Sequence, residues 1–281
     1  MSATHPLFLY GTAWKEERTE DLCFQALVAG FIGIDTANQR KHYYEEAVGR
    51  GFQKFLNQTG RKRAEFFLQT KFTFARGQDH RKPYDEQAPY GEQVVQSFAS
   101  SLKHLGTGYL DSYLLHGPFQ GSGLTAPDFE VWEAMEELFE KKMARQLGVS
   151  NFSLEQLTAL VGNSRVKPSF VQNRCYAIRG WDREIREFCL MNKIIYQGFS
   201  LLTANVAQLS AAPVVEIAKK YKKTIPQIAF RFAHQVGMLP ITGTSNLQHM
   251  RENLAVFDFT LEKSELQTLE SISESPHELL T

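Results

Sequence analysis

Short runs of apolar residues recur along the chain, and each is followed by a longer stretch with a different apolar spacing. The short runs are continuous rather than alternating, which is typical of parallel strands covered on both faces. Eight of them predict strands, at Leu7–Tyr10, Ile32–Asp35, Phe66–Thr70, Leu110–Leu115, Ala144–Val149, Phe170–Gln172, Ile194–Gly198 and Met238–Ile241.

The longer stretches carry apolar residues at helical spacing, and several end in glycine. Helices are predicted at Thr19–Gly30, Gln93–Gly106, Phe129–Lys142 and Leu154–Gly162. Ser153 followed by Gln156 has the spacing of a capping box at the start of the last of these helices.

Eight strand–helix alternations favour a closed α/β barrel over an open doubly wound sheet. The 281 residues suit such a barrel, whose usual length is roughly 250 residues. No Gly-x-Gly-x-x-Gly motif follows the first strand, which weakens the open-sheet alternative. We predict one (β/α)8 TIM-barrel domain over residues 1–281, with eight parallel strands ringed by helices and extra helices near the C-terminus.

One segment, residues 72–90, interrupts this regular pattern. It is long, polar and irregular, and it contains Pro83 and Pro89. Long loops in compact domains are often binding loops or lids. Because this segment follows the third strand, at the end where barrel active sites are built, we expect it to border the site.

Charge and cysteine content narrow the class of protein. Lysine plus arginine equals aspartate plus glutamate at 31 each, so no net field recruits nucleic acid or a membrane surface. Three cysteines without close pairing favour a reducing compartment and no metal site. Residues Met1–Pro6 do not begin a signal peptide, and no apolar run approaches the ~20 residues of a membrane span. We therefore expect a cytoplasmic protein.

Polar residues stand at the ends of the predicted strands, which converge on one pocket in a barrel. Asp35 alone could cap a helix, Lys71 could be a surface charge, and a lone His116 is more often a satisfied core histidine. Together they have a chemical use. Lys71 held cationic by Asp35 would lower the pKa of a neighbouring phenol, and Tyr43 and Tyr44 are both available. His116 could then hold a substrate oxygen as it gains negative charge.

The residues around these groups resemble the aldo-keto reductase family, in the family's order from about Gly11 to Leu254. The matching blocks are Ile34-Asp35-Thr36-Ala37, Gln69-Thr70-Lys71, Leu114-Leu115-His116-Gly117-Pro118, Gly148-Val149-Ser150-Asn151-Phe152, Val171-Gln172-Asn173, Tyr196-Gln197-Gly198-Phe199-Ser200-Leu201-Leu202, Pro240-Ile241-Thr242-Gly243-Thr244-Ser245 and Glu252-Asn253-Leu254. The resemblance implies reduction of an aldehyde or ketone by a nicotinamide cofactor, with a catalytic set of Asp35, Tyr43, Lys71 and His116.

The resemblance also implies binding roles. Ser150, Asn151 and Gln172 would hold the nicotinamide carboxamide, and Phe199 would stack under its ring. The other cofactor contacts would be Thr12, Ser200, Leu202, Gly243, Thr244, Ser245, His249, Glu252 and Asn253. The substrate pocket would be bordered by Trp14, Gly117 and Phe119.

The sequence departs from the family at several places. Residues 39–42 lengthen the usual spacing from aspartate to tyrosine, so we prefer Tyr43 as proton donor, with Tyr44 as the rival. Many members carry a tryptophan at the position of Gly117, and its loss should widen the substrate pocket.

The cofactor-phosphate site departs too. Gly243-Thr244 replaces a usual lysine-serine pair, and His249 replaces an arginine whose charged fork histidine cannot copy. Backbone amides of residues 243–245 at a helix start could still hold the phosphate. We therefore expect NADPH ahead of NADH, which stays possible.

Two alternatives to a carbonyl reductase remain. One is an NADPH-binding redox sensor or accessory subunit with little turnover. The other is a Schiff-base lyase that uses Lys71 as nucleophile, although a lysine paired with Asp35 should stay charged. The sequence names only a small-molecule carbonyl substrate, and it leaves the oligomeric state open.

Overall fold

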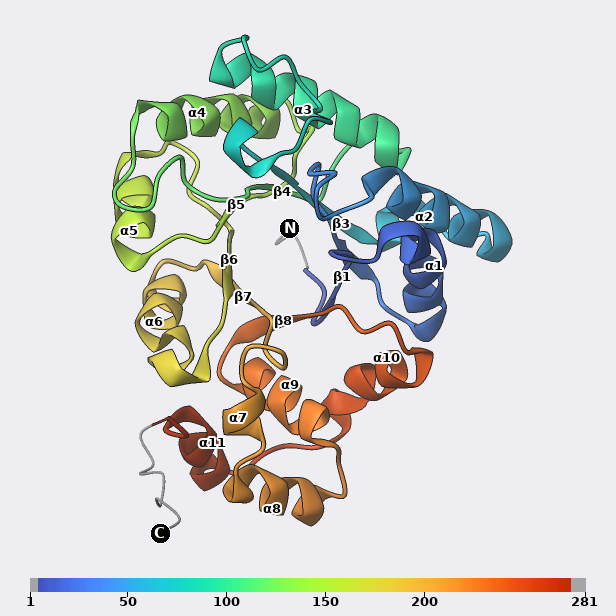
Figure 1. Ribbon diagram of the computed structural model, residues 1–281, viewed down its shortest axis with the longest axis vertical. Coiled ribbons are helices and arrows are strands. Elements are labelled where there is room, and N and C mark those ends of the chain that lie inside the picture. Colours follow the sequence, from blue (N-terminus) through green and yellow to red (C-terminus); the bar gives the residue numbers. More distant parts are fainter. Residues whose placement is uncertain (1–4, 274–281) are drawn as a thin grey trace.

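The computed structural model describes residues 5–273, and its eight strands close into one parallel barrel (Figure 1). Neighbouring strands pair in sequence order, and the last strand pairs with the first through Leu9 and Ile241. The strands are β1 Leu9–Gly11, β2 Gly33–Asp35, β3 Phe67–Phe72, β4 Ser112–Leu115, β5 Leu147–Ser150, β6 Phe170–Arg174, β7 Ile195–Phe199 and β8 Met238–Thr242. The predicted (β/α)8 barrel is therefore confirmed.

Helices surround the barrel, and α8 and α11 form its outermost part at the bottom of Figure 1. The α-helices are α1 Thr19–Ala29, α2 Glu45–Thr59, α3 Tyr90–Leu105, α4 Ala126–Glu140, α5 Leu154–Asn163, α6 Arg183–Met191, α7 Val206–Leu209, α8 Ala212–Tyr221, α9 Ile225–Gln235, α10 Leu247–Leu254 and α11 Lys263–Glu270. Short 3-10 helices occur at Glu16–Arg18, Arg63–Glu65, Ala75–Gly77, Ala177–Asp182 and Ala255–Asp258. Helices beyond one per strand do occur near the C-terminus, as predicted.

The interior of the barrel changes from apolar to polar along its axis. At the bottom, Leu9, Phe67, Phe170, Leu239 and Ile241 form a buried cluster. These side chains point inward from their strands, while the opposite faces of the strands pack under the helices. Such a layered interior is typical of this barrel, where inward side chains from alternate strands stack in layers.

A layer of glutamine side chains lies further along the barrel. Gln69 Nε2 donates to Gln197 Oε1 at 2.8 Å, and Gln197 Nε2 donates back to Gln69 Oε1 at 2.9 Å. Gln172 Nε2 donates to the same Gln197 oxygen at 2.9 Å. Buried amides are costly unless they are hydrogen-bonded, so these three side chains hold one another in place. They form a rigid support for the residues above them.

The predicted capping box at the start of α5 is confirmed. The backbone amide of Gln156 donates to Ser153 Oγ at 3.2 Å, and the backbone amide of Ser153 donates to Gln156 Oε1 at 3.0 Å. Both donors would otherwise lack a helical partner.

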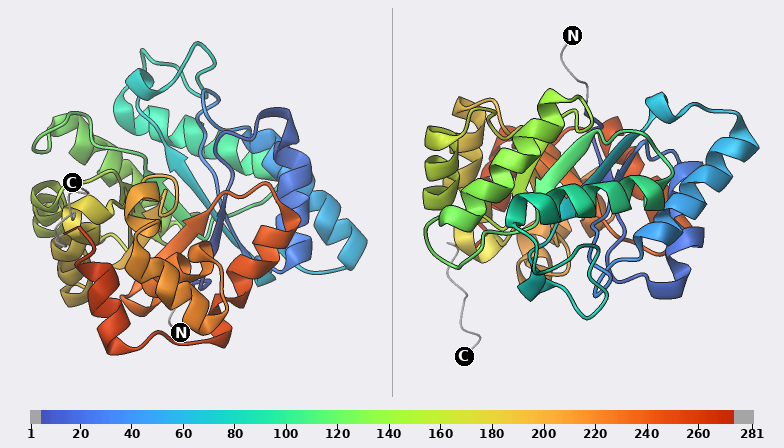
Figure 2. Two further views of the ribbon diagram at one scale, coloured as in Figure 1. Left: turned by 60° about the horizontal axis from the view of Figure 1, so that its bottom comes forward. Right: turned by 90° about the horizontal axis from the view of Figure 1, so that it is seen from above.

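The long segment of residues 72–90 extends β3 by its first residue and then runs as a loop to α3. The loop, cyan in Figure 2, projects beyond the barrel in both views. It is held down by buried contacts: Tyr84 Oη donates to the carbonyl oxygen of Thr73 at 2.6 Å, and Gln78 Nε2 donates to that of Asn38 at 2.8 Å. The second contact ties this loop to the one that follows β2.

Three further expectations concern the cysteines, membrane-spanning helices and the N-terminal segment. Within residues 5–273, Cys23, Cys175 and Cys189 are buried free thiols, and burial raises the pKa of each to about 12. No helix in that range combines the length and apolar character needed to cross a membrane. The first four residues of Met1–Pro6, the segment inspected for a signal peptide, lie outside the described range.

Candidate active site

A cavity of about 1750 Å³ lies across the C-terminal ends of the strands. One part of its wall is formed by Tyr43 and His116, and another, far along the chain, by Glu252 and Asn253. The cavity therefore connects the residues predicted to be catalytic with residues predicted to bind the cofactor. Its other walls come from the loops after β1, β5, β6, β7 and β8.

The buried pair Asp35 and Lys71 lies beneath one wall. Lys71 has no exposed surface, and its Nζ lies 2.7 Å from Asp35 Oδ1 and 2.8 Å from the carbonyl oxygen of Thr36. Burial lowers the pKa of Lys71, and the adjacent Asp35 carboxylate opposes that change. Asp35 lines the cavity whereas Lys71 does not, so Lys71 can act there as a charge but not as a nucleophile.

Tyr43 lies between this pair and His116. The Lys71 Nζ is 5.3 Å from the centre of the Tyr43 ring, and the His116 ring meets it edge-on at 5.8 Å. The pKa of the Tyr43 phenol is raised, first by burial and second by the Asp35 carboxylate. The predicted net lowering of this pKa is therefore wrong: burial and the Asp35 carboxylate both disfavour the phenolate, and the charge of Lys71 does not overcome them.

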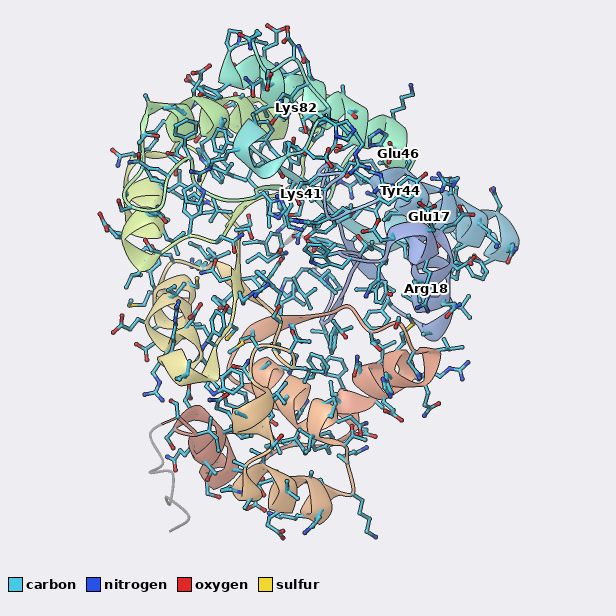
Figure 3. The ribbon with its side chains drawn as sticks, viewed as in Figure 1. Glu17, Arg18, Lys41, Tyr44, Glu46 and Lys82 are labelled. Atoms are coloured by element: carbon cyan, nitrogen blue, oxygen red, sulfur yellow. The ribbon has the colours of Figure 1, made fainter. Side chains whose placement is uncertain are left out.

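Tyr44 lies in a different environment. Its ring packs under the guanidinium groups of Arg40, at 4.0 Å, and Arg50, at 5.2 Å, and it does not line the cavity. Figure 3 shows Tyr44 with Glu46 on the ring of helices near the start of α2, while Lys41 lies nearer the barrel axis. Of the two tyrosines, Tyr44 is therefore the one that packs at the surface, away from the cavity.

The extra residues before Tyr43 fold as a turn. The backbone amides of His42 and Tyr43 both donate to the carbonyl oxygen of Gln39, at 3.1 and 3.0 Å. The side-chain Nε2 of Gln39 donates to the carbonyl oxygen of Gly77 at 2.6 Å, which fixes the turn against the next loop. The turn takes up the additional length and returns Tyr43 to the strand ends.

His116 stands directly after β4 with one ring nitrogen already bonded. Its Nδ1 lies 2.7 Å from the hydroxyl oxygen of the buried Thr73. The pKa of His116 is well below its usual range, first because of burial and then because of the charges of Lys71 and His42. The imidazole is therefore neutral at neutral pH, and Nε2 is the nitrogen left for a ligand in the cavity.

The residues predicted to hold the carboxamide do line the cavity. Asn151 has a left-handed backbone, with φ of 60°, and its Nδ2 donates to the carbonyl oxygen of His116 at 2.9 Å and to Ser150 Oγ at 3.1 Å. Gln172 Nε2 donates to Asp35 Oδ1 at 2.9 Å, besides its bond in the glutamine layer. The amide nitrogen of Gln172 is thus engaged, and its oxygen is the group that remains for a ligand.

Most of the other predicted cofactor residues also line the cavity. They come from the end of β7, from the loops after β7 and β8, and from α10: Phe199, Ser200, Leu202, Gly243, Thr244, His249, Glu252 and Asn253. Ser200 has a φ of 56°, a left-handed conformation that is uncommon for serine and often marks functional sites. Asn253 Nδ2 is held by Thr242 Oγ1 at 3.0 Å.

Several predicted residues lie outside this cavity. The hydroxyl of Thr12 is buried and donates to the carbonyl oxygen of Asp35 at 3.0 Å, so it serves the strand ends instead of the cavity. Ser245 is exposed and does not line the cavity. Phe119 packs edge-on against Phe74, at 5.2 Å, and Tyr90, at 5.7 Å. Of the predicted substrate-pocket residues, Trp14 does line the cavity.

The start of α10 is capped by a side chain. Asn246 Oδ1 accepts hydrogen bonds from the backbone amides of Gln248, at 2.8 Å, and His249, at 3.2 Å. These two donors are satisfied within the helix cap. The phosphate was assigned to the backbone amides of residues 243–245, which precede the cap, and that assignment stays a prediction.

The sequence interpretation missed three residues of the site. Thr73 contacts His116, Lys15 lines the cavity and donates to the carbonyl oxygen of Gly243, and His42 stacks on Trp14 at 4.0 Å. Thr73 lies three residues after the predicted strand end at Thr70, and Lys15 lies five residues after the one at Tyr10, so both are on the loops that directly follow predicted strands. His42 lies seven residues after Asp35, in the turn that the sequence did not predict.

Taken together, the wall around Tyr43 can donate a proton. A neutral phenol, a neutral imidazole and a buried ammonium–carboxylate pair lie side by side, and no group of three metal-ligating side chains occurs among residues 5–273. A ligand oxygen placed next to Tyr43 and His116 would meet two hydrogen-bond donors near a fixed positive charge.

Comparison with known proteins gives consistent matches. A model of the aldo/keto reductase family matches residues 9–274. The NAD/NADP-dependent indole-3-acetaldehyde reductase of Schizosaccharomyces pombe is 31% identical over 97% of this chain and 92% of that protein. The NADPH-dependent alpha-keto amide reductase of Saccharomyces cerevisiae is 30% identical over 90% and 82%. The crystal structure of a Bombyx mori aldo-keto reductase in complex with NADP has a TM-score of 0.82 and 26% identity, and covers 97% of this chain and 91% of that one.

Proposed function

This chain belongs to the aldo/keto reductase family, and from that premise we propose that it reduces an aldehyde or ketone to an alcohol with NADPH, with Tyr43 as proton donor. The observation that carries the proposal is the grouping of Tyr43, His116, Lys71 and Asp35 at one wall of the large cavity. The substrate is a small-molecule carbonyl compound.

The residues along the cavity fit a nicotinamide dinucleotide. Ser150, Asn151 and the Gln172 oxygen offer polar groups for a carboxamide, and Phe199 offers a ring for stacking. When bound, the cofactor supplies the hydride that reduces the carbonyl carbon. The Bombyx mori structure contains NADP, which favours the same class of cofactor here.

The phosphate end of the site favours NADPH, although NADH stays possible. Lys15 lies beside Gly243, to whose carbonyl oxygen it donates, and both residues line the cavity with His249. A lysine ammonium at this place can hold a phosphate as a point charge. Lys15 thus offers a positive charge beside Gly243, the position where the family usually has a lysine.

Tyr43 is suited to give up its proton only when an acceptor develops beside it. Its raised pKa keeps the phenol protonated at neutral pH. As a substrate oxygen becomes negative and takes the proton, the Lys71 charge 5.3 Å from the ring stabilises the phenolate that forms. Asp35 keeps Lys71 charged in spite of its burial. General acid catalysis of this kind contributes about 100- to 10,000-fold in rate.

His116 orients the substrate oxygen. When the hydroxyl of Thr73 donates to Nδ1, the single proton of the neutral ring resides on Nε2. That nitrogen is then a donor toward the cavity, where it can hold the carbonyl oxygen next to Tyr43.

The proposal is tested by a fluorescence titration of the purified protein with NADPH and, separately, with NADH, followed by addition of a panel of carbonyl compounds. Tight binding with oxidation of NADPH is expected. Binding without oxidation would favour the redox sensor or accessory subunit, and binding of neither cofactor would overturn the proposal. The lyase alternative has lost its basis, because Lys71 has no exposed surface and does not line the cavity.

A further inference from the structure

A second, smaller hollow of about 210 Å³ opens beside His116. Gln39, His116 and Asn151 line both this hollow and the large cavity, so the two spaces adjoin at the catalytic wall. We name this space the side hollow. A carbonyl compound whose oxygen lies at Tyr43 and His116 can extend one substituent into it.

The absence of a side chain at Gly117 keeps the side hollow open. A Cβ atom built on Gly117 would meet only the carbonyl oxygen of Ser150, at 3.9 Å, which is ordinary contact. The space next to this glycine is therefore free, and the loop after β4 borders it without filling it.

Arg76 supplies the charge of the side hollow. This residue lines the hollow from the loop after β3. Its Nη2 donates to the carbonyl oxygen of Pro118, and its Cζ lies 5.7 Å from the centre of the Phe119 ring. These contacts hold the guanidinium at the wall while its other N–H donors stay available.

Arg76 differs from Arg81, the next arginine along the chain, in having no carboxylate partner among the described residues. Arg81, on the same loop, forms an ion pair with Asp79, whereas no carboxylate in the described part of the chain pairs with Arg76. The loop that carries Arg76 is fixed where Gln39 Nε2 donates to the carbonyl oxygen of Gly77 at 2.6 Å. A positioned, unpaired guanidinium beside an open space is a binding group for a carboxylate, which it can hold with two parallel hydrogen bonds.

We propose that the side hollow is a carboxylate subsite, with Arg76 as its anchor, and that the substrates of this reductase are short oxo acids. This inference rests on the proposed function, because it assumes that the carbonyl group reacts next to His116. The hollow is small, so the substituent that carries the carboxylate is short. Arg76 then selects among carbonyl compounds by charge.

The test compares acids with uncharged amides of the same shape. Initial rates of NADPH oxidation are measured with 2-oxopentanoate and 4-oxopentanoate and with the two corresponding amides. In the wild type, kcat/KM for at least one acid should exceed that for its amide. In Arg76→Gln the acid-to-amide ratio should fall about 10- to 100-fold, mainly through KM, the range expected for one charge-assisted contact. Arg76→Lys keeps the charge but not the planar fork, so its acid-to-amide ratio should lie between those of the wild type and Arg76→Gln.

Arg81→Gln is the matched control, because Arg81 lies on the same loop but is paired with Asp79 outside the site. It should leave the acid-to-amide ratio unchanged. An equal ratio in wild type and Arg76→Gln would overturn the proposal, as would a wild type that prefers the amides.

Failure of the proposed function gives a different result. A wild type that reduces neither the oxo acids nor butanal is not a carbonyl reductase of this kind. In that case, binding of pentanoate measured by calorimetry in the presence of NADPH decides the subsite separately. Binding that is lost in Arg76→Gln would support it, and no binding to the wild type would overturn it.

Discussion

Tyr43 and Tyr44 are neighbours in the chain, yet only Tyr43 lines the cavity, and Tyr44 packs under Arg40 and Arg50. Tyr43→Phe removes the acidic proton while keeping the ring. We expect kcat for carbonyl reduction to fall about 100- to 10,000-fold, with cofactor affinity nearly unchanged. Tyr44→Phe should retain turnover. Comparable activity in wild type and Tyr43→Phe, measured by NADPH oxidation, would show that another group gives the proton.

A second prediction at the scale of single residues concerns Thr73, a positioning residue that acts through His116. Thr73→Val keeps the shape but removes the hydroxyl that lies 2.7 Å from Nδ1. Loss of one hydrogen bond of about 1 kcal/mol should lower kcat roughly fivefold, because the ring nitrogens then share the proton. Thr73→Ser should restore the rate.

The readout that separates positioning from general damage is the ¹⁵N chemical shift of the His116 ring nitrogens. The wild type and Thr73→Ser should show protonated Nε2 and unprotonated Nδ1 above pH 6.5, because burial holds the pKa of His116 well below that value. If Thr73→Val gives the same shifts as the wild type, Thr73 does not set the tautomer.

At the scale of elements, α2 and α3 approach each other at Gly49. A Cβ atom at this position would lie 1.8 Å from the backbone carbonyl oxygen of His104, far inside contact distance. Gly49→Ala must therefore separate the two helices, and we expect it to reduce the free energy of unfolding by about 1–3 kcal/mol or more. Urea unfolding monitored by circular dichroism measures the loss.

The control for this substitution is Gly162→Ala in α5. No atom lies within 4 Å of a Cβ built at Gly162, and the backbone there is not left-handed. The change should be neutral or stabilising by roughly 0.5–1 kcal/mol, because glycine is costly within a helix. Equal effects of the two substitutions would contradict the close approach of α2 and α3.

At the scale of the whole molecule, the cavity gathers residues from many parts of the barrel. The residues that line the cavity begin with Gly11, the last residue of β1, and end with Asn253 in α10. A cofactor that binds only the folded chain must therefore stabilise it as a unit. At 100 times its Kd, NADPH should add about 2.7 kcal/mol to the free energy of unfolding. Thermal unfolding with and without cofactor checks this.

The same experiment tests the choice of cofactor. NADH at equal concentration should raise the melting temperature less than NADPH, because it lacks the phosphate that Lys15 would hold. Equal stabilisation by the two cofactors would show that this phosphate is not recognised. In that case Lys15→Met should leave the stabilisation by NADPH and by NADH unchanged.

The sequence by itself determined the architecture. Continuous apolar runs marked all eight strands because both faces of a parallel strand are buried, and each strand lies within a few residues of its predicted place. Strand order also placed Asp35, Lys71 and His116 correctly at one end of the barrel, because the C-terminal ends of parallel strands lie together. The capping box of Ser153 and Gln156 could also be predicted from the sequence, because it depends only on the spacing of two nearby residues.

Only the tertiary structure decided what those side chains face. The turn at Gln39 places Tyr43 and not Tyr44 at the cavity, and burial together with Asp35 raises the pKa that a lysine alone would have lowered. The hydroxyl of Thr12 donates to the backbone carbonyl oxygen of Asp35, and the side-chain nitrogen of Gln172 donates to the Asp35 carboxylate, which leaves the Gln172 oxygen for a ligand. The hydrogen-bond partners and the burial of these side chains depend on residues that are distant in the sequence. The local sequence around each side chain therefore does not predict them.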